Sequence, residues 1–159
     1  MKYCPQCAKP LKDKEIDGRM RKACEDEACG YVFWGNPTPV VAAIVEHEGN
    51  VILVRQEQWP EKMLGLVTGF LEKGETPEEG VLREVREELG LEGRVASLVG
   101  VYGFEAANQV IIAFHVIAEG TVTLGDELER CKAVAPEKLK PWPMGTGFAI
   151  RDWLERRKQ

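Results

Sequence analysis

Three features are missing from this sequence, and each absence excludes a class of protein. No apolar run approaches the roughly 20 residues that a membrane-spanning helix needs, because the longest, residues 40–45, is only as long as a strand. The opening segment, MKYCPQCAKP, lacks the apolar stretch of a secretory signal, so we expect a cytoplasmic protein without a membrane partner. Internal repeats and low-complexity tracts are also missing, which leaves an ordinary globular chain.

An excess of positive charge is absent as well. The 21 Lys and Arg residues are outnumbered by 26 Asp and Glu residues, which gives a net charge of −5. Because no general basic field attracts polyanions, nucleic acid is not expected as a partner, and a phosphate-rich substrate would need a bound cation. The 159 residues, 30% charged and 44% hydrophobic, suit one globular domain with a small appendage.

The cysteines gather at the N-terminus. Four of the five form two close pairs, and these are Cys4, Cys7, Cys24 and Cys29. Two pairs separated by a short polar hairpin suit tetrahedral zinc, and Asp17-Gly18 is a favourable turn between two strands. We therefore expect a structural zinc ribbon over residues 1–35, folded by its metal. Two disulfides are the alternative interpretation, which requires an oxidising compartment.

The remaining residues, 36–159, predict a second domain that begins with a proline-containing linker. One glycine-rich segment, residues 65–75, has no helical period and is interpreted as a loop. The predicted strands cover residues 40–46, 50–57, 95–104, 109–118 and 131–135. Together with helices at 77–89 and 148–157, this order predicts an α/β domain with helices on both faces of a mixed sheet.

Residues 77–89 form the best-specified helix in the sequence. Thr76 is placed as the N-cap, Pro77 suits the first helical position, and Glu79 completes a capping box with Thr76. Gly90 supplies the C-terminal stop. Apolar residues recur at helical spacing at Val81, Leu82, Val85 and Leu89. The helix is therefore expected to turn one apolar stripe toward the core.

Three glutamates lie beside that stripe. On a helical wheel, Glu84, Glu87 and Glu88 fall within an arc of about 100°, at the edge of the core rather than opposite it. Crowding of this kind raises carboxyl pKa values unless a cation lies among the groups, and clustered carboxylates suit Mg²⁺ or Mn²⁺ bound to phosphates. A solvated face with ion pairs is the alternative, because helices rich in Glu and Arg are common.

The segment GFLEKGETPEEGVLREVREELGL resembles a complete Nudix box. The pattern is glycine, five residues, glutamate, seven residues, then Arg-Glu-apolar-x-Glu-Glu-x-Gly-apolar. Its specified positions are occupied by Gly69, Glu75, Arg83, Glu84, Val85, Glu87, Glu88, Gly90 and Leu91. The resemblance implies a Nudix-type α/β/α sandwich with a mixed sheet, preceded here by the zinc ribbon.

The resemblance also implies an enzyme, a pyrophosphohydrolase that uses Mg²⁺ or Mn²⁺ to hydrolyse the pyrophosphate bond of a nucleoside diphosphate linked to another moiety. The implied magnesium ligands are the carbonyl of Gly69 and the carboxylates of Glu84, Glu87 and Glu88, one of which can alternatively act as the base. Arg83 and Glu75 would orient this set. Glu127 or Glu129 is a candidate for a further ligand or base, with simple solvation as the alternative.

The order of zinc ribbon and Nudix domain resembles two groups, the NADH pyrophosphatases and a group that cleaves FAD or ADP-ribose. The NADH group carries Ser-Gln-Pro-Trp-Pro-Phe-Pro-x-Ser soon after the box, and residues 97–110 here contain no proline. The proline that many ADP-ribose enzymes carry about sixteen residues past the box is missing too, and the segment AANQVIIAFHVIAEG followed by ELERC is most similar to the FAD/ADP-ribose group. The expected substrates are FAD, ADP-ribose or NADH, and Tyr102 and Phe104 are candidates for stacking on their rings unless both belong to the core.

Two other functions stay open at this point. The chain can be a housecleaning pyrophosphatase for nucleoside triphosphates, which is distinguished by its release of inorganic pyrophosphate. It can also be a catalytically silent module that binds nucleotides or RNA through the ribbon. A monomer and a homodimer are both compatible with the sequence.

Overall fold

The computed structural model describes residues 1–158, and the chain divides into two compact units. The first unit spans Met1–Pro37 and the second Thr38–Gln159. Each unit has its own sheet and its own buried side chains. No helix within residues 1–158 is both long enough and apolar enough to cross a membrane.

The first unit is a three-stranded antiparallel sheet of β1 (Leu11–Ile16), β2 (Arg19–Cys24) and β3 (Val32–Phe33). Asp17 and Gly18 adopt φ values of 51° and 71°, the left-handed conformation of a two-residue hairpin turn. The two expected strands flanking this turn are confirmed. The buried apolar side chains of this unit are few, and they are Cys4, Leu11, Ala23 and Cys24. So small a core does not by itself stabilise a sheet of this size.

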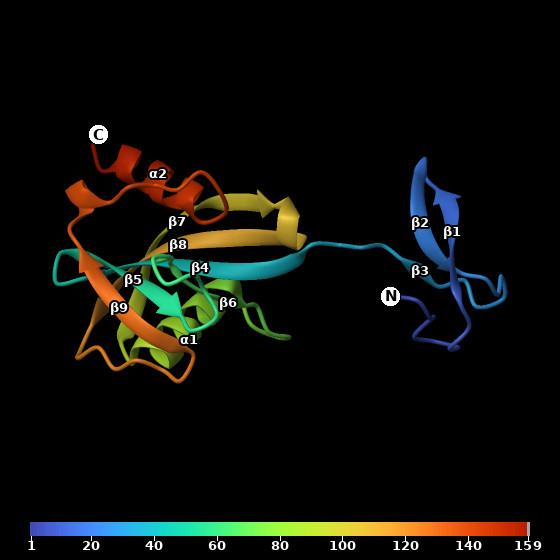
Figure 1. Ribbon diagram of the computed structural model, residues 1–159, viewed down its shortest axis with the longest axis horizontal. Helices are drawn as coiled ribbons and strands as arrows, with labels where there is room; N and C mark the ends of the chain where they lie inside the picture. Colours follow the sequence, from blue (N-terminus) through green and yellow to red (C-terminus); the bar gives the residue numbers. More distant parts are fainter. Residues whose placement is uncertain (159) are drawn as a thin grey trace. The chain divides into compact units, whose positions relative to one another are not determined.

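Six strands and two α-helices build the second unit (Figure 1). They are β4 (Thr38–His47), β5 (Asn50–Gln56), β6 (Val67–Phe70), α1 (Pro77–Leu89), β7 (Glu92–Phe104), β8 (Gln109–Glu119), β9 (Leu128–Val134) and α2 (Gly147–Arg156). The sheet order is β7-β8-β4-β5-β9, with β6 paired to β4 off this path. Strands β4 and β8 are parallel and the other pairs are antiparallel.

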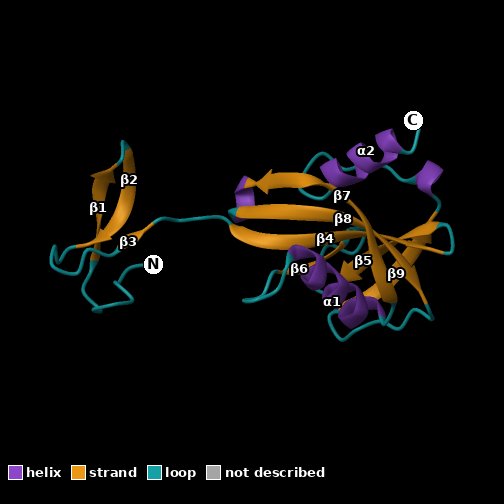
Figure 2. Ribbon diagram, turned by 180° about the vertical axis from the view of Figure 1, so that it is seen from behind, coloured by secondary structure: helices purple, strands orange, loops and turns teal. Residues whose placement is uncertain are grey.

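The two helices cover opposite faces of this sheet, as both ribbon views show (Figures 1 and 2). Strand β4 is apolar along most of its length because both of its faces are buried. Val41, Ala43 and Val45 belong to the core beneath α1, and Val40, Ala42 and Ile44 belong to the core beneath α2. The mixed-sheet α/β/α sandwich expected from the sequence is confirmed.

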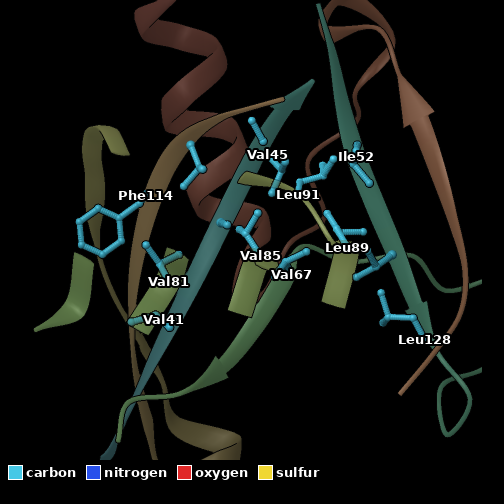
Figure 3. Close-up of a cluster of buried hydrophobic side chains, with 14 residues drawn as sticks. Val41, Val45, Ile52, Val67, Val81, Val85, Leu89, Leu91, Phe114 and Leu128 are labelled. Atoms are coloured by element: carbon cyan, nitrogen blue, oxygen red, sulfur yellow. The ribbon is translucent and has the colours of Figure 1, made fainter. Parts of the chain in front are cut away.

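The core beneath α1 contains the apolar stripe of that helix (Figure 3). Val81, Val85 and Leu89 are fully buried there and pack with residues of the sheet that include Phe114. Removing each such aliphatic side chain from water contributes about 1.5–3 kcal/mol. This packing fixes the rotation of α1 about its axis, and so decides where its polar residues point.

One prediction about local structure is wrong. The segment of residues 65–75, expected to be a loop, contains strand β6. In β6, Gly69 pairs with Val41 and Thr68 pairs with Ala42 of the central strand β4. A four-residue strand with a glycine has little local β signal, and its pairing with a distant strand stabilises it.

Candidate active site and zinc site

Helix α1 begins and ends where its sequence signals lie. The Thr76 hydroxyl accepts from the Glu79 amide at 3.2 Å, and the Glu79 carboxylate accepts from the Thr76 amide at 2.8 Å. Gly90 ends the helix with a φ of 65°, and its amide donates to the Arg86 carbonyl at 2.9 Å. The predicted helix, its capping box and its C-terminal glycine are therefore confirmed.

The three glutamates of α1 lie at different depths. Glu88 is 6% exposed, whereas the side chains of Glu84 and Glu87 are 13% and 59% exposed. The inner two flank the buried stripe, so the packing of Val81 and Val85 carries them toward the sheet. A solvated face therefore describes Glu87 alone among the three.

Arg83 connects the glutamates to the segment that precedes the helix. Its Nε and Nη2 atoms donate to the two oxygens of Glu75 at 2.6 and 3.1 Å. Its Nη1 donates to Glu84 at 2.6 Å and to Glu87 at 2.9 Å, and its Nη2 also reaches the Phe70 carbonyl at 3.1 Å. Hydrogen bonds from Arg83 lower the pKa of Glu75. A single guanidinium thus orients three carboxylates.

Glu88 lacks such a partner. Burial, with the charges of Glu84, Glu127 and Glu87 around it, raises the pKa of Glu88 to about 8. Burial also raises the pKa of Glu84, against the opposing hydrogen bond from Arg83. Within residues 1–158, the buried Oε2 atom of Glu88 has no hydrogen-bond partner. An unpaired, buried oxygen among crowded carboxylates fits a divalent cation, which would supply the missing positive charge.

Gly69 lies against this cluster on strand β6. A Cβ atom at this position would collide with the Glu84 carboxyl group, so only glycine lets the carboxylate lie against the strand backbone. Gly80 on α1 has a related role, because its Cβ would come within 2.9 Å of Leu71 and 3.1 Å of the Glu75 carboxylate. Both glycines allow α1 and the preceding segment to pack closely.

A cavity of about 690 Å³ surrounds these groups and is called here the acidic cavity. Its acidic lining residues come from α1, from the segment before α1 and from the segment before β9, and they are Glu72, Glu84, Glu87, Glu88, Asp126 and Glu127. The Gly125 amide donates to the Glu88 carbonyl at 2.9 Å, a contact that holds the loop before β9 against α1. The structure thus brings together residues about 40 positions apart in the sequence, a proximity that no local pattern encodes.

Glu127 and Glu129, the two candidates for an additional ligand or base, lie in different surroundings. Glu127 lines the acidic cavity. Glu129 instead forms an ion pair with Arg55, whose side chain is buried. Glu127 is therefore the candidate that the fold places near the glutamates of α1.

A second cavity, of about 610 Å³, adjoins the first and is called here the aromatic recess. The two share the lining residues Val40, Thr68 and Gln109. Large apolar side chains of the recess are Trp59, Met63, Phe104, Trp142 and Met144. The Trp59 ring lies over Gly65, where a Cβ would approach within 2.8 Å of it. Arg55 fixes this loop by donating to the Trp59 carbonyl at 2.8 Å.

The two aromatic candidates from the sequence separate in the structure. Phe104 lines the aromatic recess. Tyr102 lies in the core beneath α2, where its hydroxyl donates to Asp152 at 2.9 Å, and it lines neither cavity. Burial and this hydrogen bond raise the pKa of Tyr102 to about 12. Tyr102 thus connects β7 to α2, and Phe104 is the one of the two that the fold places at the aromatic recess.

The four N-terminal cysteines converge. Their sulfur atoms all lie within 4.8 Å of one another, with 3.7 Å between Cys4 and Cys29 and 3.5 Å between Cys7 and Cys24. A tetrahedral zinc ion with bonds of about 2.3 Å separates its sulfur ligands by about 3.8 Å, whereas a disulfide joins them at about 2.05 Å. The spacing therefore fits zinc and not disulfides.

Fold and site first define a class of protein. An α/β/α sandwich presents a capped helix whose glutamates enter a cavity beside a glycine-bearing strand, the arrangement of a Nudix-type hydrolase. The NUDIX domain family model matches residues 36–154, and the chain therefore belongs to the NUDIX domain family. The expectation of a member of this family is confirmed.

Two curated relatives are named NAD-capped RNA hydrolase NudC. The protein from Pseudomonas fluorescens is 24% identical over 150 residues, which cover 93% of this chain and 53% of that protein. The protein from Mycobacterium tuberculosis is 37% identical over 83 residues, which cover 51% of this chain and 26% of that protein. This chain thus spans about half of the length of the first relative.

Solved structures give the same fold. A NUDIX hydrolase from Nitrosomonas europaea is 25% identical with a TM-score of 0.82, covering 99% of this chain and 93% of that one. An ADP-ribose pyrophosphatase from Streptococcus suis is 17% identical with a TM-score of 0.64, covering 78% of this chain and 94% of that one. The second likeness concerns the fold alone.

Sequence reasoning missed the two tryptophans of the recess. Trp59 follows β5 in a connecting segment, and Trp142 stands between two prolines in Pro141-Trp142-Pro143. Large aromatic side chains in connections between elements, rather than in strands, were the available signal. Their position beside the box became visible only through the three-dimensional fold.

Proposed function

We propose that this protein hydrolyses the pyrophosphate bond of a nucleoside diphosphate joined to a second moiety, with FAD, ADP-ribose and NADH as the leading substrates. One observation carries the proposal: the acidic cavity and the aromatic recess adjoin, with Val40, Thr68 and Gln109 lining both. Such a pair of spaces suits a molecule with a charged anhydride in one part and a planar ring in another.

The acidic cavity is the place for the anhydride. Glu84, Glu87 and Glu88, with the Gly69 carbonyl, would hold Mg²⁺ or Mn²⁺, which polarises phosphoryl oxygens and lowers the pKa of a water molecule when bound. Arg83 keeps two of these carboxylates oriented through its hydrogen bonds. One glutamate of the cluster or Glu127 would accept the proton of the attacking water.

The aromatic recess is the place for a ring. Trp59, Phe104 and Trp142 offer faces on which a nucleobase or flavin can stack, and the recess contains no carboxylate. The name of the relative from Pseudomonas fluorescens agrees with this substrate class, since NAD contains a nucleoside diphosphate with a second moiety. It supports the proposal without selecting one compound.

The first unit has a structural part in the proposal. We assign zinc to Cys4, Cys7, Cys24 and Cys29, whose sulfur spacing suits the ion. Four thiolates leave no open position for water on the metal, so this site stabilises the ribbon instead of performing chemistry. Hydrolysis is assigned to the second unit.

A substrate panel tests the proposal. FAD, ADP-ribose, NADH and nucleoside triphosphates are incubated with the full chain and Mg²⁺ or Mn²⁺, and the products are separated by chromatography. The expected products are AMP and the phosphorylated remainder of a dinucleotide. Release of inorganic pyrophosphate from triphosphates, with no dinucleotide cleaved, would establish the housecleaning alternative instead.

A variant links any activity to the cluster. Glu87→Gln keeps the shape of a mostly exposed side chain and removes its charge, so the fold should persist while turnover falls about 100-fold or more. Unchanged turnover in this variant would refute the assignment. No turnover by the natural chain on any compound of the panel would favour the silent binding module.

A further inference from the structure

In the β1–β2 hairpin of the first unit, basic and acidic side chains are distributed unequally between the two faces of the sheet. In an antiparallel hairpin, directly paired residues point to one side of the sheet and their neighbours along the strand to the other. By the register of β1 and β2, in which Lys14 pairs with Arg21, one face carries Lys12, Lys14, Arg19 and Arg21. Both acidic residues of β1, Asp13 and Glu15, lie on the opposite face.

The name basic face is used for Lys12, Lys14, Arg19 and Arg21 together with Trp34. Few of its charges are neutralised nearby. Lys12 pairs with Glu25 at 2.9 Å, but within residues 1–158 Lys14 and Arg19 make no ion pair. On the opposite face, Lys22 pairs with Asp13 at 2.7 Å, and Glu15 adds a further negative charge. The basic face therefore keeps a surplus of positive charge, whereas the strand residues of the opposite face carry one more negative than positive charge.

Trp34 adds an aromatic surface to these cations. The Arg21 guanidinium carbon lies 4.7 Å from the centre of the Trp34 ring, and its Nη1 donates to the Trp34 carbonyl at 2.9 Å. Trp34 is nevertheless 48% exposed, so much of the indole meets solvent beside the cations. Proteins hold single-stranded nucleic acids with this combination, because bases stack on the ring and cations contact the phosphates.

We propose that the basic face binds single-stranded polynucleotide through its phosphate backbone and through base stacking on Trp34. The net charge of the whole chain conceals this surface. Residues 1–37 carry 7 basic and 6 acidic side chains, a net charge of +1, and the rest of the chain carries 14 and 20, a net charge of −6. The surface lies within the first unit, so it is independent of hydrolysis by the second.

Binding of labelled oligonucleotides tests the proposal. The full zinc-loaded chain is titrated into a fluorescein-labelled single strand of about 12 nucleotides, as RNA and as DNA of the same sequence, and anisotropy is recorded at several salt concentrations. We expect a dissociation constant in the range of about 1–100 μM. The logarithm of the association constant should fall with the logarithm of salt concentration with a slope of about −2 to −3, as for three or four phosphate contacts.

Two double variants with the same change in net charge localise the binding. Lys14→Gln with Arg19→Gln removes two charges from the basic face and should weaken binding about tenfold, with a slope shallower by about 1.4. Lys9→Gln with Lys22→Gln removes two charges that are paired with Asp26 and Asp13, and should change affinity by less than about twofold. Comparison of RNA with DNA shows whether the sugar contributes.

Trp34→Ala separates stacking from charge. It should weaken binding about tenfold and leave the salt slope unchanged, because a ring and no cation is lost. Zinc content and circular dichroism confirm that each variant keeps the ribbon folded. The proposal is overturned if neither RNA nor DNA binds below about 100 μM, or if the two double variants lose affinity equally.

Discussion

The two units of this chain reach stability by different routes. In residues 1–37 the buried apolar side chains are few and include two of the four clustered cysteines, so the proposed zinc ion would be the main cross-link. In the second unit, two apolar cores cover both faces of one sheet. The second unit can therefore tolerate unpaired carboxylates in a cavity, because its fold does not depend on them. In our proposal, metal is structural in one unit and serves chemistry in the other.

The largest effect should come from removing zinc. Loss of the metal, or Cys24→Ser, should unfold residues 1–37, because zinc binding supplies about 10 kcal/mol or more to such small domains. The second unit should keep its native structure. Nuclear magnetic resonance spectra would show collapsed amide dispersion for the first unit only. Cys131→Ala, outside the cluster, is the control that should leave the ribbon intact.

A native ribbon spectrum in the metal-free chain would contradict the proposed difference between the units, in which only the first needs metal to fold. It would mean that the few apolar side chains of the ribbon suffice for folding. Unfolding of both units together would also contradict it, because the fold of the second unit would then depend on the first.

A smaller effect on stability is expected from truncating a side chain in the core beneath α1. Leu89 is fully buried there, and Leu89→Ala should lower the free energy of unfolding of the second unit by about 2–5 kcal/mol. Leu98, on strand β7, is 50% exposed, and Leu98→Ala should change this free energy by less than about 0.5 kcal/mol. Urea denaturation measures both. Equal effects of the two substitutions would contradict the packing described for α1.

The two arginines of the Nudix box, Arg83 and Arg86, should differ in their effect on kcat/KM. Arg83→Gln removes the group that orients Glu75, Glu84 and Glu87, and should lower kcat/KM about 10–100-fold. Arg86 makes two hydrogen bonds of 3.0 Å to the exposed Glu92, so Arg86→Gln should leave kcat/KM within about twofold of the natural value. Steady-state kinetics on the best substrate compares them. A similar loss in both variants would argue against Arg83 as the orienting residue.

A smaller effect is expected for the pH dependence of the stabilisation of the second unit by Mg²⁺. Because burial raises the pKa of Glu88 to about 8, its protonation stabilises the metal-free fold fully below its ordinary pKa of 4.5 and progressively less as pH rises toward 8. Mg²⁺ replaces that proton, so the rise in Tm on adding Mg²⁺ should be small at pH 5 and larger at pH 8. Differential scanning calorimetry checks this, and a rise that is independent of pH would contradict it. Glu88→Gln should remove most of the pH dependence.

Local sequence patterns were sufficient to predict α1 and the hairpin of the ribbon. The cap formed by Thr76 and Glu79, the stop at Gly90 and the turn at Asp17-Gly18 each depend on neighbours in the chain, so short-range chemistry decides them. The glutamate cluster was also accessible, because helical periodicity places Glu84 and Glu88 beside the buried stripe.

Contacts between segments that are distant in the sequence could not be predicted from local patterns. Strand β6 exists because it pairs with β4, and the four residues of β6 alone give no such signal. The aromatic recess joins Trp59, Phe104 and Trp142 from three separate segments. Likewise, the net charge of the whole chain averages over the basic face, which only the pairing of β1 with β2 reveals. In each case the missing information was which strands pair.

In the proposed mechanism, the buried glutamates of α1 hold the divalent cation on which hydrolysis depends. The most direct measurement is turnover against Mg²⁺ concentration for the natural chain, Glu84→Gln and Glu78→Gln, with zinc content and unfolding temperature recorded for each. Glu78 is exposed in the first turn of the same helix. We predict that Glu78→Gln matches the natural chain within about twofold, and that Glu84→Gln loses about 100-fold or more while remaining folded. Natural turnover with an unchanged Mg²⁺ dependence in Glu84→Gln would contradict the claim.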